Sequence, residues 1–163
     1  MLRCGLIAVV VIALSAAAGA SVAAADPVIM AAGDIACASP GSTSPGTCSQ
    51  AYTSNLLLTQ KSSAEGLAAV LTLGDNQYDS GGLANFRAYF DPTWGRLGSS
   101  LRPALGNHEY LTSGASGYFD YFTGLGVPTG NRGEGWYSYD IGSWHLIALN
   151  SSDGCKPVSC AKG

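Results

Sequence analysis

The stretch that decides the fold is GLAAVLTLGDNQY, which occupies residues 66–78. Its apolar run over residues 67–73 predicts a buried strand, because aliphatic residues follow one another without a charge. Gly74 and Asp75 end that run, and a glycine lets the backbone turn sharply at that point. The polar residues Asn76, Gln77 and Tyr78 are therefore expected just beyond the end of the strand.

Two other predicted strands end in the same way. An apolar run over residues 28–32 stops at Gly33-Asp34, and a shorter one over residues 103–105 stops at Gly106-Asn107. In an open α/β sheet, ligands bind beyond the carboxyl ends of parallel strands. The sequence therefore predicts that Asp34, Asp75 and Asn107 lie together at one edge of a sheet.

Helical patterns separate these strands. Residues 49–60 predict a helix with Ser49 as its N-cap, residues 83–90 predict a shorter one, and residues 117–122 predict a helical turn. The order strand, helix, strand, helix, strand is typical of a parallel sheet with crossovers, which gives the α/β class. Residues 136–140 and 144–150 predict a hairpin that follows.

The side chains at the predicted edge are typical of a metal site. Asp34, Asp75 and Asn107 supply hard oxygen ligands, and Tyr78 and His108 stand beside two of them. A pair of metal ions ~3.5–4 Å apart needs a carboxylate that bridges them and separate ligands for each ion. A single Gly-Asp is ordinary turn chemistry, but three such strand ends in register favour a site.

The motifs around these residues resemble a known family. They are similar to the first three motifs of the calcineurin-like metallophosphoesterases, and the Asp-x-x-Tyr form of the second resembles the purple acid phosphatase branch. The resemblance spans residues 28–151 and is carried by Gly33-Asp34-Ile35-Ala36, Gly74-Asp75-Asn76-Gln77-Tyr78 and Gly106-Asn107-His108-Glu109-Tyr110.

The resemblance implies a fold, an activity and roles for five residues. The fold would be a metallophosphoesterase-type β-sandwich with flanking helices, of which this chain holds the first half. Asp34 and a Tyr78 phenolate would bind the first of two metal ions (Fe, Zn or Mn), Asp75 would bridge both, and Asn107 would bind the second. A metal-held hydroxide would attack phosphorus in a phosphate ester, as in acid or alkaline phosphatases, while His108 would face the phosphate.

The sequence departs from the family pattern at two points. Ala36 stands where many members have a histidine, and the later single His and Gly-His-x-His motifs are absent, with His145 the only histidine after His108. His145 follows Trp144 in an apolar strand, where a histidine is more often structural. We therefore expect residues 26–163 to be the N-terminal part of a longer domain. The alternatives are a catalytically incompetent secreted module with a partial metal site and a structural domain of the envelope.

Residues 1–25 are typical of a secretory signal peptide. A positive start at Arg3 precedes an apolar run over residues 6–14, and small residues lead to Ala25, where cleavage is expected. The product would be secreted or held in the cell envelope, with no membrane association after removal of the signal. This product has four cysteines, Cys37, Cys48, Cys155 and Cys160. In an oxidising compartment we expect them to form two local disulfides, Cys37–Cys48 and Cys155–Cys160, and a zinc site is the alternative.

Composition excludes one class of partner. Of 163 residues only 12% are charged, and the formal net charge is -3. Nucleic-acid binding needs a basic face, so this composition argues against it. The partner that the family resemblance implies is a phosphate ester, and the oligomeric state stays open. Glu109 has two candidate roles, to orient His108 or to cap a helix.

Overall fold

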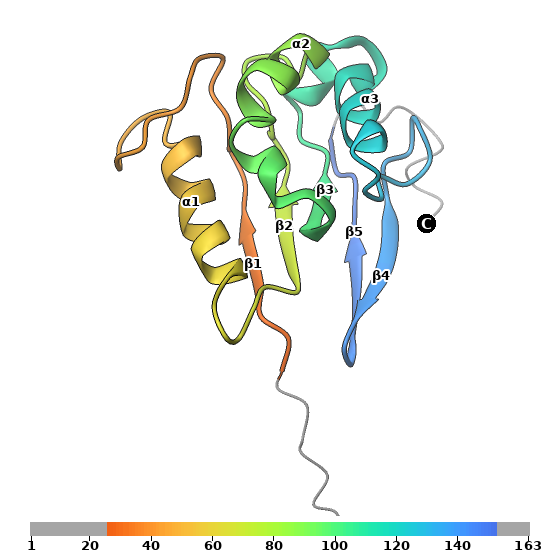
Figure 1. The fold of residues 1–163 in the computed structure, drawn as a ribbon. Coiled ribbons are helices and arrows are strands. Elements are labelled where there is room, and N and C mark those ends of the chain that lie inside the picture. The colour runs from red at the N-terminus through yellow and green to blue at the C-terminus, as the bar shows by residue number, and fades with distance from the viewer. Residues whose placement is uncertain (1–25, 153–163) are drawn as a thin grey trace, which may run out of the picture.

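The structure, a computed structural model, describes residues 26–152 as a mixed α/β fold (Figure 1). The parallel sheet has the order β1-β2-β3, and β4 and β5 form a separate antiparallel hairpin. The predicted α/β class and the parallel sheet are confirmed, whereas the expected signal peptide lies outside the described residues. The strands are β1 (Ile29–Ala32), β2 (Ala69–Leu73), β3 (Leu101–Ala104), β4 (Tyr137–Ile141) and β5 (Trp144–Ala148).

Helices and helical turns connect the strands. None of those in residues 26–152 is both long and apolar enough to cross a membrane. The helix expected over residues 83–90 is a short α-helical turn followed by a π-helical turn. The elements are α1 (Gln50–Lys61), α2 (Leu83–Asn85), η1 (Phe86–Phe90), η2 (Trp94–Ser100), η3 (Glu109–Leu111), η4 (Ser113–Ala115) and α3 (Ser116–Gly124).

Several strand boundaries and one cap differ from the sequence prediction. β2 begins at Ala69 and not at residue 67, and β5 ends at Ala148 and not at residue 150. β3 begins at Leu101, two residues before the predicted start, because Leu101 and Arg102 pair with Val70 and Leu71 of β2. The guanidinium of Arg102 lies over the ring of Tyr139, 5.4 Å from its centroid. Ser49 occupies the N-cap position of α1 without capping it, because its hydroxyl donates to the carbonyl oxygen of Gly46 at 2.5 Å.

The hydrophobic core lies on the helical side of the parallel sheet. Val70 of β2 and Leu101 of β3 are fully buried there, beneath aromatic residues of η1 and α3. The rings of Phe86, Phe90 and Phe122 meet edge to face with centroids 5.5–5.6 Å apart, an arrangement that aromatic quadrupoles favour. This core fixes the sheet and therefore the positions at which its strands end.

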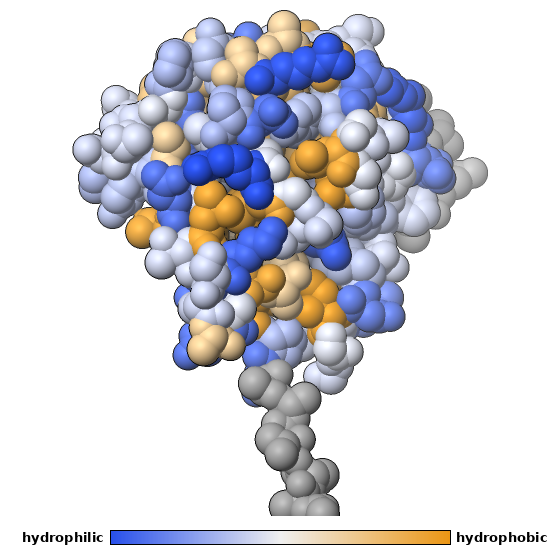
Figure 2. Space-filling model, in the orientation of Figure 1, coloured by the Kyte–Doolittle hydropathy of each residue, from blue (hydrophilic) through white to orange (hydrophobic). Residues whose placement is uncertain are grey.

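The other side of the sheet carries exposed apolar side chains. Because side chains alternate along a strand, Leu73 lies on the face opposite Val70 and is 63% exposed. Ile147 and Leu149, at the end of the hairpin, line a hollow with Leu73 and are 62% and 71% exposed. On the face turned to the viewer in Figure 2, by contrast, apolar side chains form separate patches between polar ones.

A disulfide closes the loop between β1 and α1. It joins Cys37 and Cys48, which is the local pairing expected for this part of the chain. Cys155 and Cys160 lie outside the described residues. The closed loop begins three residues after Asp34 of the first Gly-Asp pair.

Candidate functional site

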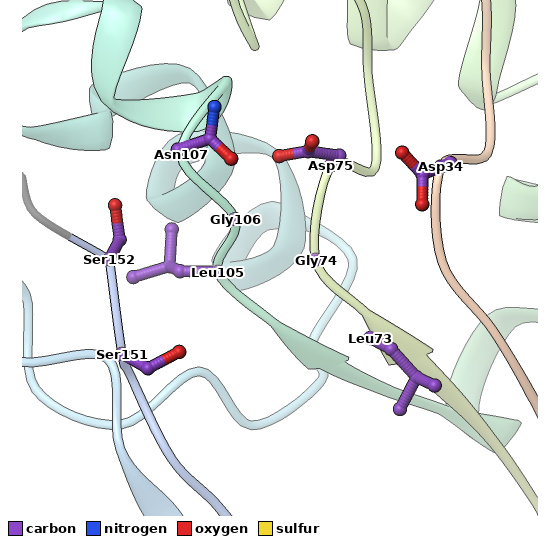
Figure 3. Close-up of a pocket in the computed structure, with 9 residues that line it drawn as sticks. All are labelled: Asp34, Leu73, Gly74, Asp75, Leu105, Gly106, Asn107, Ser151 and Ser152. Carbon is purple, nitrogen blue, oxygen red and sulfur yellow. The ribbon is translucent and has the colours of Figure 1, made fainter.

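The carboxyl ends of the three parallel strands meet at one rim. Asp34, Asp75 and Asn107 follow β1, β2 and β3, and all three line a pocket of ≈ 450 Å³. Figure 3 shows their side chains in a row along the rim, with Ser151 and Ser152 on the Asn107 side of the pocket. The structure therefore brings together the three oxygen-bearing residues that the strand ends predicted.

Both aspartates have a left-handed backbone. The φ angle is 54° at Asp34 and 49° at Asp75, a region that aspartate and asparagine tolerate better than most residues. The two loops then run side by side beyond the sheet, because the Ile35 N–H donates to the Asp75 carbonyl at 3.0 Å. The paired turn places both carboxylates on the same side of the rim.

Glycines before the polar residues permit this close approach. A Cβ atom added to Gly106 would lie 2.1 Å from Oδ1 of Asp75, and one added to Gly74 would lie 2.9 Å from the Cα of Gly106. Real Cβ atoms do not approach other atoms so closely. The Gly-x pattern of the sequence thus reflects crowding between neighbouring loops as well as the turn itself.

Tyr78 joins the two carboxylates. Its phenol oxygen lies 2.5 Å from Oδ1 of Asp34 and 3.1 Å from Oδ2 of Asp75, so one oxygen atom is within hydrogen-bond distance of both side chains. Burial raises the pKa of Tyr78 above its usual value, and the hydrogen bonds to the two carboxylates raise it further. The phenol is therefore protonated here and shares its hydrogen with two negative groups.

His108 is fixed at both its backbone and its ring. The His108 N–H donates to Oδ1 of Asp75 at 3.0 Å, and Nδ1 of the imidazole lies 2.5 Å from the carbonyl oxygen of Asp79. A carbonyl only accepts, so Nδ1 donates in this contact, and Nε2 is the other nitrogen of the ring. The ring also packs against that of Tyr78, with centroids 4.4 Å apart.

Glu109 has a role that sequence analysis missed. Its side chain is fully buried. Oε1 accepts the backbone N–H groups of Asn76 at 2.8 Å and Gln77 at 3.2 Å, and Oε2 accepts those of Gly106 at 2.8 Å and Asp75 at 3.1 Å. The residue neither orients the His108 ring nor caps a helix, because its carboxylate ties the loop after β2 to the loop after β3.

Burial raises the pKa of Glu109, and the N–H groups that it accepts oppose that change. The signal available in the sequence was the position of Glu109 between a strand end and a cluster of aromatic residues, which indicates burial. A buried carboxylate needs hydrogen-bond donors around it. Nothing in the sequence indicated that the donors would be backbone groups of a distant loop.

The donors at the rim fit a hard cation in chemical type. The rim offers two carboxylates, a phenol and an amide. These oxygen ligands suit hard cations such as Mn²⁺, Mg²⁺ or ferric iron better than soft cations that prefer thiolates. Within residues 26–152, however, no group of three or more His, Cys, Asp or Glu side chains is arranged to hold a metal ion. His145 does not approach the rim, because its Nδ1 pairs with Asp140 at 2.7 Å on the exposed hairpin.

Comparison with known proteins finds no match for this chain, whether to a family model, to a curated protein or to a solved structure. A function must therefore be argued from the residues of the chain and their geometry.

Proposed function

We propose that this chain is the N-terminal part of a secreted, metal-dependent phosphoric ester hydrolase that resembles the purple acid phosphatase branch of the calcineurin-like metallophosphoesterases. The observation that carries the proposal is the contact of the Tyr78 phenol with both Asp34 and Asp75. These two carboxylates come from separate strand ends, 41 positions apart, and Asn107 shares their pocket. Parallel strands end at a common edge, and here each of the three strand ends presents an oxygen-bearing side chain to the same pocket.

The exposed side of the sheet supports the finer fold assignment. Leu73, Ile147 and Leu149 are each more than 60% exposed on a side that the described helices do not cover. A second sheet packed on this side would bury them, as in a β-sandwich with flanking helices. Residues 26–163 would then belong to one metallophosphoesterase domain.

The residues that would hold the metal ions are Asp34, Asp75, Tyr78 and Asn107, with Asp75 between the two positions. Iron, zinc or manganese bound there would polarise the phosphoryl oxygens of the substrate and bring the pKa of water near neutrality. Tyr78 would bind as a phenolate. Its phenol proton, which is shared with the two carboxylates, would pass to solvent when a cation is bound.

His108 would act on the substrate phosphate. Its Nδ1–H is held by the Asp79 carbonyl and its backbone N–H by Asp75, so the ring has little freedom to rotate away from the rim. Nε2 would donate a hydrogen bond or a proton to the phosphate ester. Proton transfer by a positioned histidine typically contributes about 10²–10⁴-fold to the rate.

The second candidate function is a secreted module that keeps part of a metal site and has no turnover. The observation that favours it is the donor count, because the rim offers four oxygen donors and residues 26–152 hold no cluster of three His, Cys, Asp or Glu side chains. Such a module would bind metal weakly and leave phosphate esters intact.

The test uses the full chain with Mn²⁺, Zn²⁺ or Fe³⁺ and follows hydrolysis of an aryl phosphate and binding of the metal. Asp75→Asn keeps a residue that tolerates the left-handed backbone and removes the charge, and Asp140→Asn, on the exposed hairpin, is the matched control. We expect Asp75→Asn to lose metal binding and turnover, His108→Ala to lose about 10²–10⁴-fold in turnover, and Asp140→Asn to change neither.

Equal activity in the wild type, Asp75→Asn and His108→Ala would refute the hydrolase. Metal binding that Asp75→Asn abolishes, without hydrolysis by the wild type, would favour the second candidate.

A further inference from the structure

A second, smaller hollow adjoins the rim on the side of β1. It measures ≈ 230 Å³ and is enclosed by the end of β1, the disulfide-closed loop, the first turns of α1 and Trp94. Asp34 lines both this hollow and the pocket at the rim, and Tyr78 borders the hollow as well. A ligand held at Asp34 therefore has this hollow directly beside it.

The walls of the hollow are mainly apolar. Ile35 and Trp94 are buried beneath it, with 8% and 2% of their surfaces exposed, and Ala32 and the Cys37–Cys48 disulfide also line it. An apolar lining favours an apolar occupant, because burial removes its surface from water.

The hydroxyl groups at the walls already have partners. The Thr53 hydroxyl accepts the indole N–H of Trp94 at 3.1 Å and donates to the Ser49 carbonyl at 3.1 Å. The Ser49 hydroxyl donates to the carbonyl oxygen of Gly46. A polar ligand would have to compete for these groups, whereas a hydrocarbon group would leave them as they are.

The size and the lining together select one kind of group. A cavity of about 150 Å³ accepts benzene, and pockets for larger ligands begin near 300 Å³, so this hollow has the volume of a single ring. Two of its boundary residues, Trp94 and Tyr78, are aromatic. Aromatic rings gain from edge-to-face or offset contacts with one another.

We infer that the hollow is the subsite for the aromatic leaving group of the substrate, which makes an aryl phosphate the preferred class of ester. The inference rests on the proposed function for the phosphate end of the ligand. It adds that the hollow lined by Asp34, Trp94 and the disulfide-closed loop selects among phosphate esters by their leaving group. The phosphate would bind at the rim, and the ring, joined to it by one oxygen atom, would lie in the hollow beside Asp34, which lines both spaces.

The experiment compares four probes on the full chain in the presence of Mn²⁺: phenylphosphonate, methylphosphonate, inorganic phosphate and phenol. Ala32→Leu fills the hollow from the end of β1, and the matched control, Ala31→Leu, makes the same change at the neighbouring exposed residue, which does not line the hollow. Dissociation constants are measured by calorimetry or ligand-observed NMR, and circular dichroism checks that both variants are folded.

We expect the wild type to bind phenylphosphonate roughly tenfold more tightly than methylphosphonate, which is the gain from burying much of one ring. Ala32→Leu should reduce that ratio to about one, and Ala31→Leu should leave it unchanged. In the wild type, nuclear Overhauser contacts from the phenyl protons to the Trp94 indole should appear, and this measurement needs no variant.

The inference and the proposed function fail in different ways. Equal affinity of the wild type for the two phosphonates, or a ratio that survives in Ala32→Leu, would overturn the subsite while leaving the phosphatase proposal in place. If phosphate and both phosphonates fail to bind, the proposed function is wrong. The leaving-group subsite then falls with it, and phenol contacts with Trp94 that are lost in Ala32→Leu would show only that the hollow binds an aromatic ring.

Discussion

Glu109 holds Asn76 by a hydrogen bond of 2.8 Å from the Asn76 backbone N–H to Oε1, across 33 positions of sequence. The other oxygen of the same carboxylate accepts the N–H of Gly106 at 2.8 Å. One buried side chain thus sets the spacing between the loop that carries Asp75 and the loop that carries Asn107. Any role for these two residues as a pair depends on that spacing.

Replacing Glu109 by glutamine should destabilise the protein although the two side chains have the same shape. One carboxylate oxygen becomes an NH₂ group that faces two N–H donors, so two charge-assisted hydrogen bonds are lost. We expect a loss of about 3 kcal/mol in the free energy of unfolding, measured with urea. Glu65→Gln, at an exposed glutamate, is the control and should change stability little. Equal stability of the two variants would show that the four contacts to Glu109 are not important.

Adding a methyl group at Gly106 should disrupt the rim. The new Cβ would lie 2.1 Å from Oδ1 of Asp75, so the aspartate and its loop must move. We expect Gly106→Ala to lose about 1–3 kcal/mol of stability and to weaken Mn²⁺ binding, measured by urea unfolding and calorimetry. Gly124→Ala is the control, because its Cβ would meet no atom within 4 Å. Metal binding that is unaffected by Gly106→Ala would contradict the crowded geometry.

Removing the disulfide should lower stability without changing the core. The bond between Cys37 and Cys48 spans 11 positions, and closing a loop of this length stabilises a protein by about 3 kcal/mol through the unfolded state. The double variant Cys37→Ser/Cys48→Ser should therefore unfold at lower urea concentration than the wild type under oxidising conditions. Coincident unfolding curves would mean that the bond does not form in the purified protein.

Stability should fall at alkaline pH because of buried tyrosines. Burial, followed by the hydrogen bond to Asp91, raises the pKa of Tyr121 above its usual value, and burial does the same for Tyr118. These phenols ionise near pH 10 only in the unfolded chain, so their contribution is complete below pH 10 and is lost as the pH rises further. Each phenol should cost about 1.4 kcal/mol per pH unit above 10.

Urea unfolding between pH 8 and pH 11.5 measures this slope. Tyr121→Phe removes one ionising group. The free energy of unfolding should then fall less steeply with pH, by about 1.4 kcal/mol per pH unit. A slope that is the same in the wild type and in Tyr121→Phe would show that Tyr121 is not buried as described.

The first two strands were predictable because each is an apolar run that a Gly-Asp pair ends. The start of β3 was not, because Arg102 interrupts the apolar pattern, and its place in the strand comes from pairing with Leu71 of β2. The helical turns from Trp94 to Ser100 were also missed. Their kink is at Gly98, whose φ of 57° follows from how the chain packs and not from a periodic pattern.

The convergence of Asp34, Asp75 and Asn107 was predictable because parallel strands end at a common edge. The contact of Tyr78 with both aspartates was not predicted, because the family resemblance implied only that Tyr78 and Asp34 bind the same metal ion. The role of Glu109 could not be predicted from the sequence, because its hydrogen-bond donors are backbone N–H groups, which nearly every residue has. Such hydrogen bonds do not depend on the side chain of the donor residue, so no sequence pattern indicates them.

The exposed apolar side of the sheet also affects self-association of the protein in solution. Exposed apolar surfaces associate in water, so concentrated samples of this chain should form soluble oligomers under conditions where the secondary structure is still intact. Light scattering at rising concentration would record such clustering at temperatures where circular dichroism is unchanged. Dilute conditions or a mild detergent would then be the first choice for every measurement proposed above.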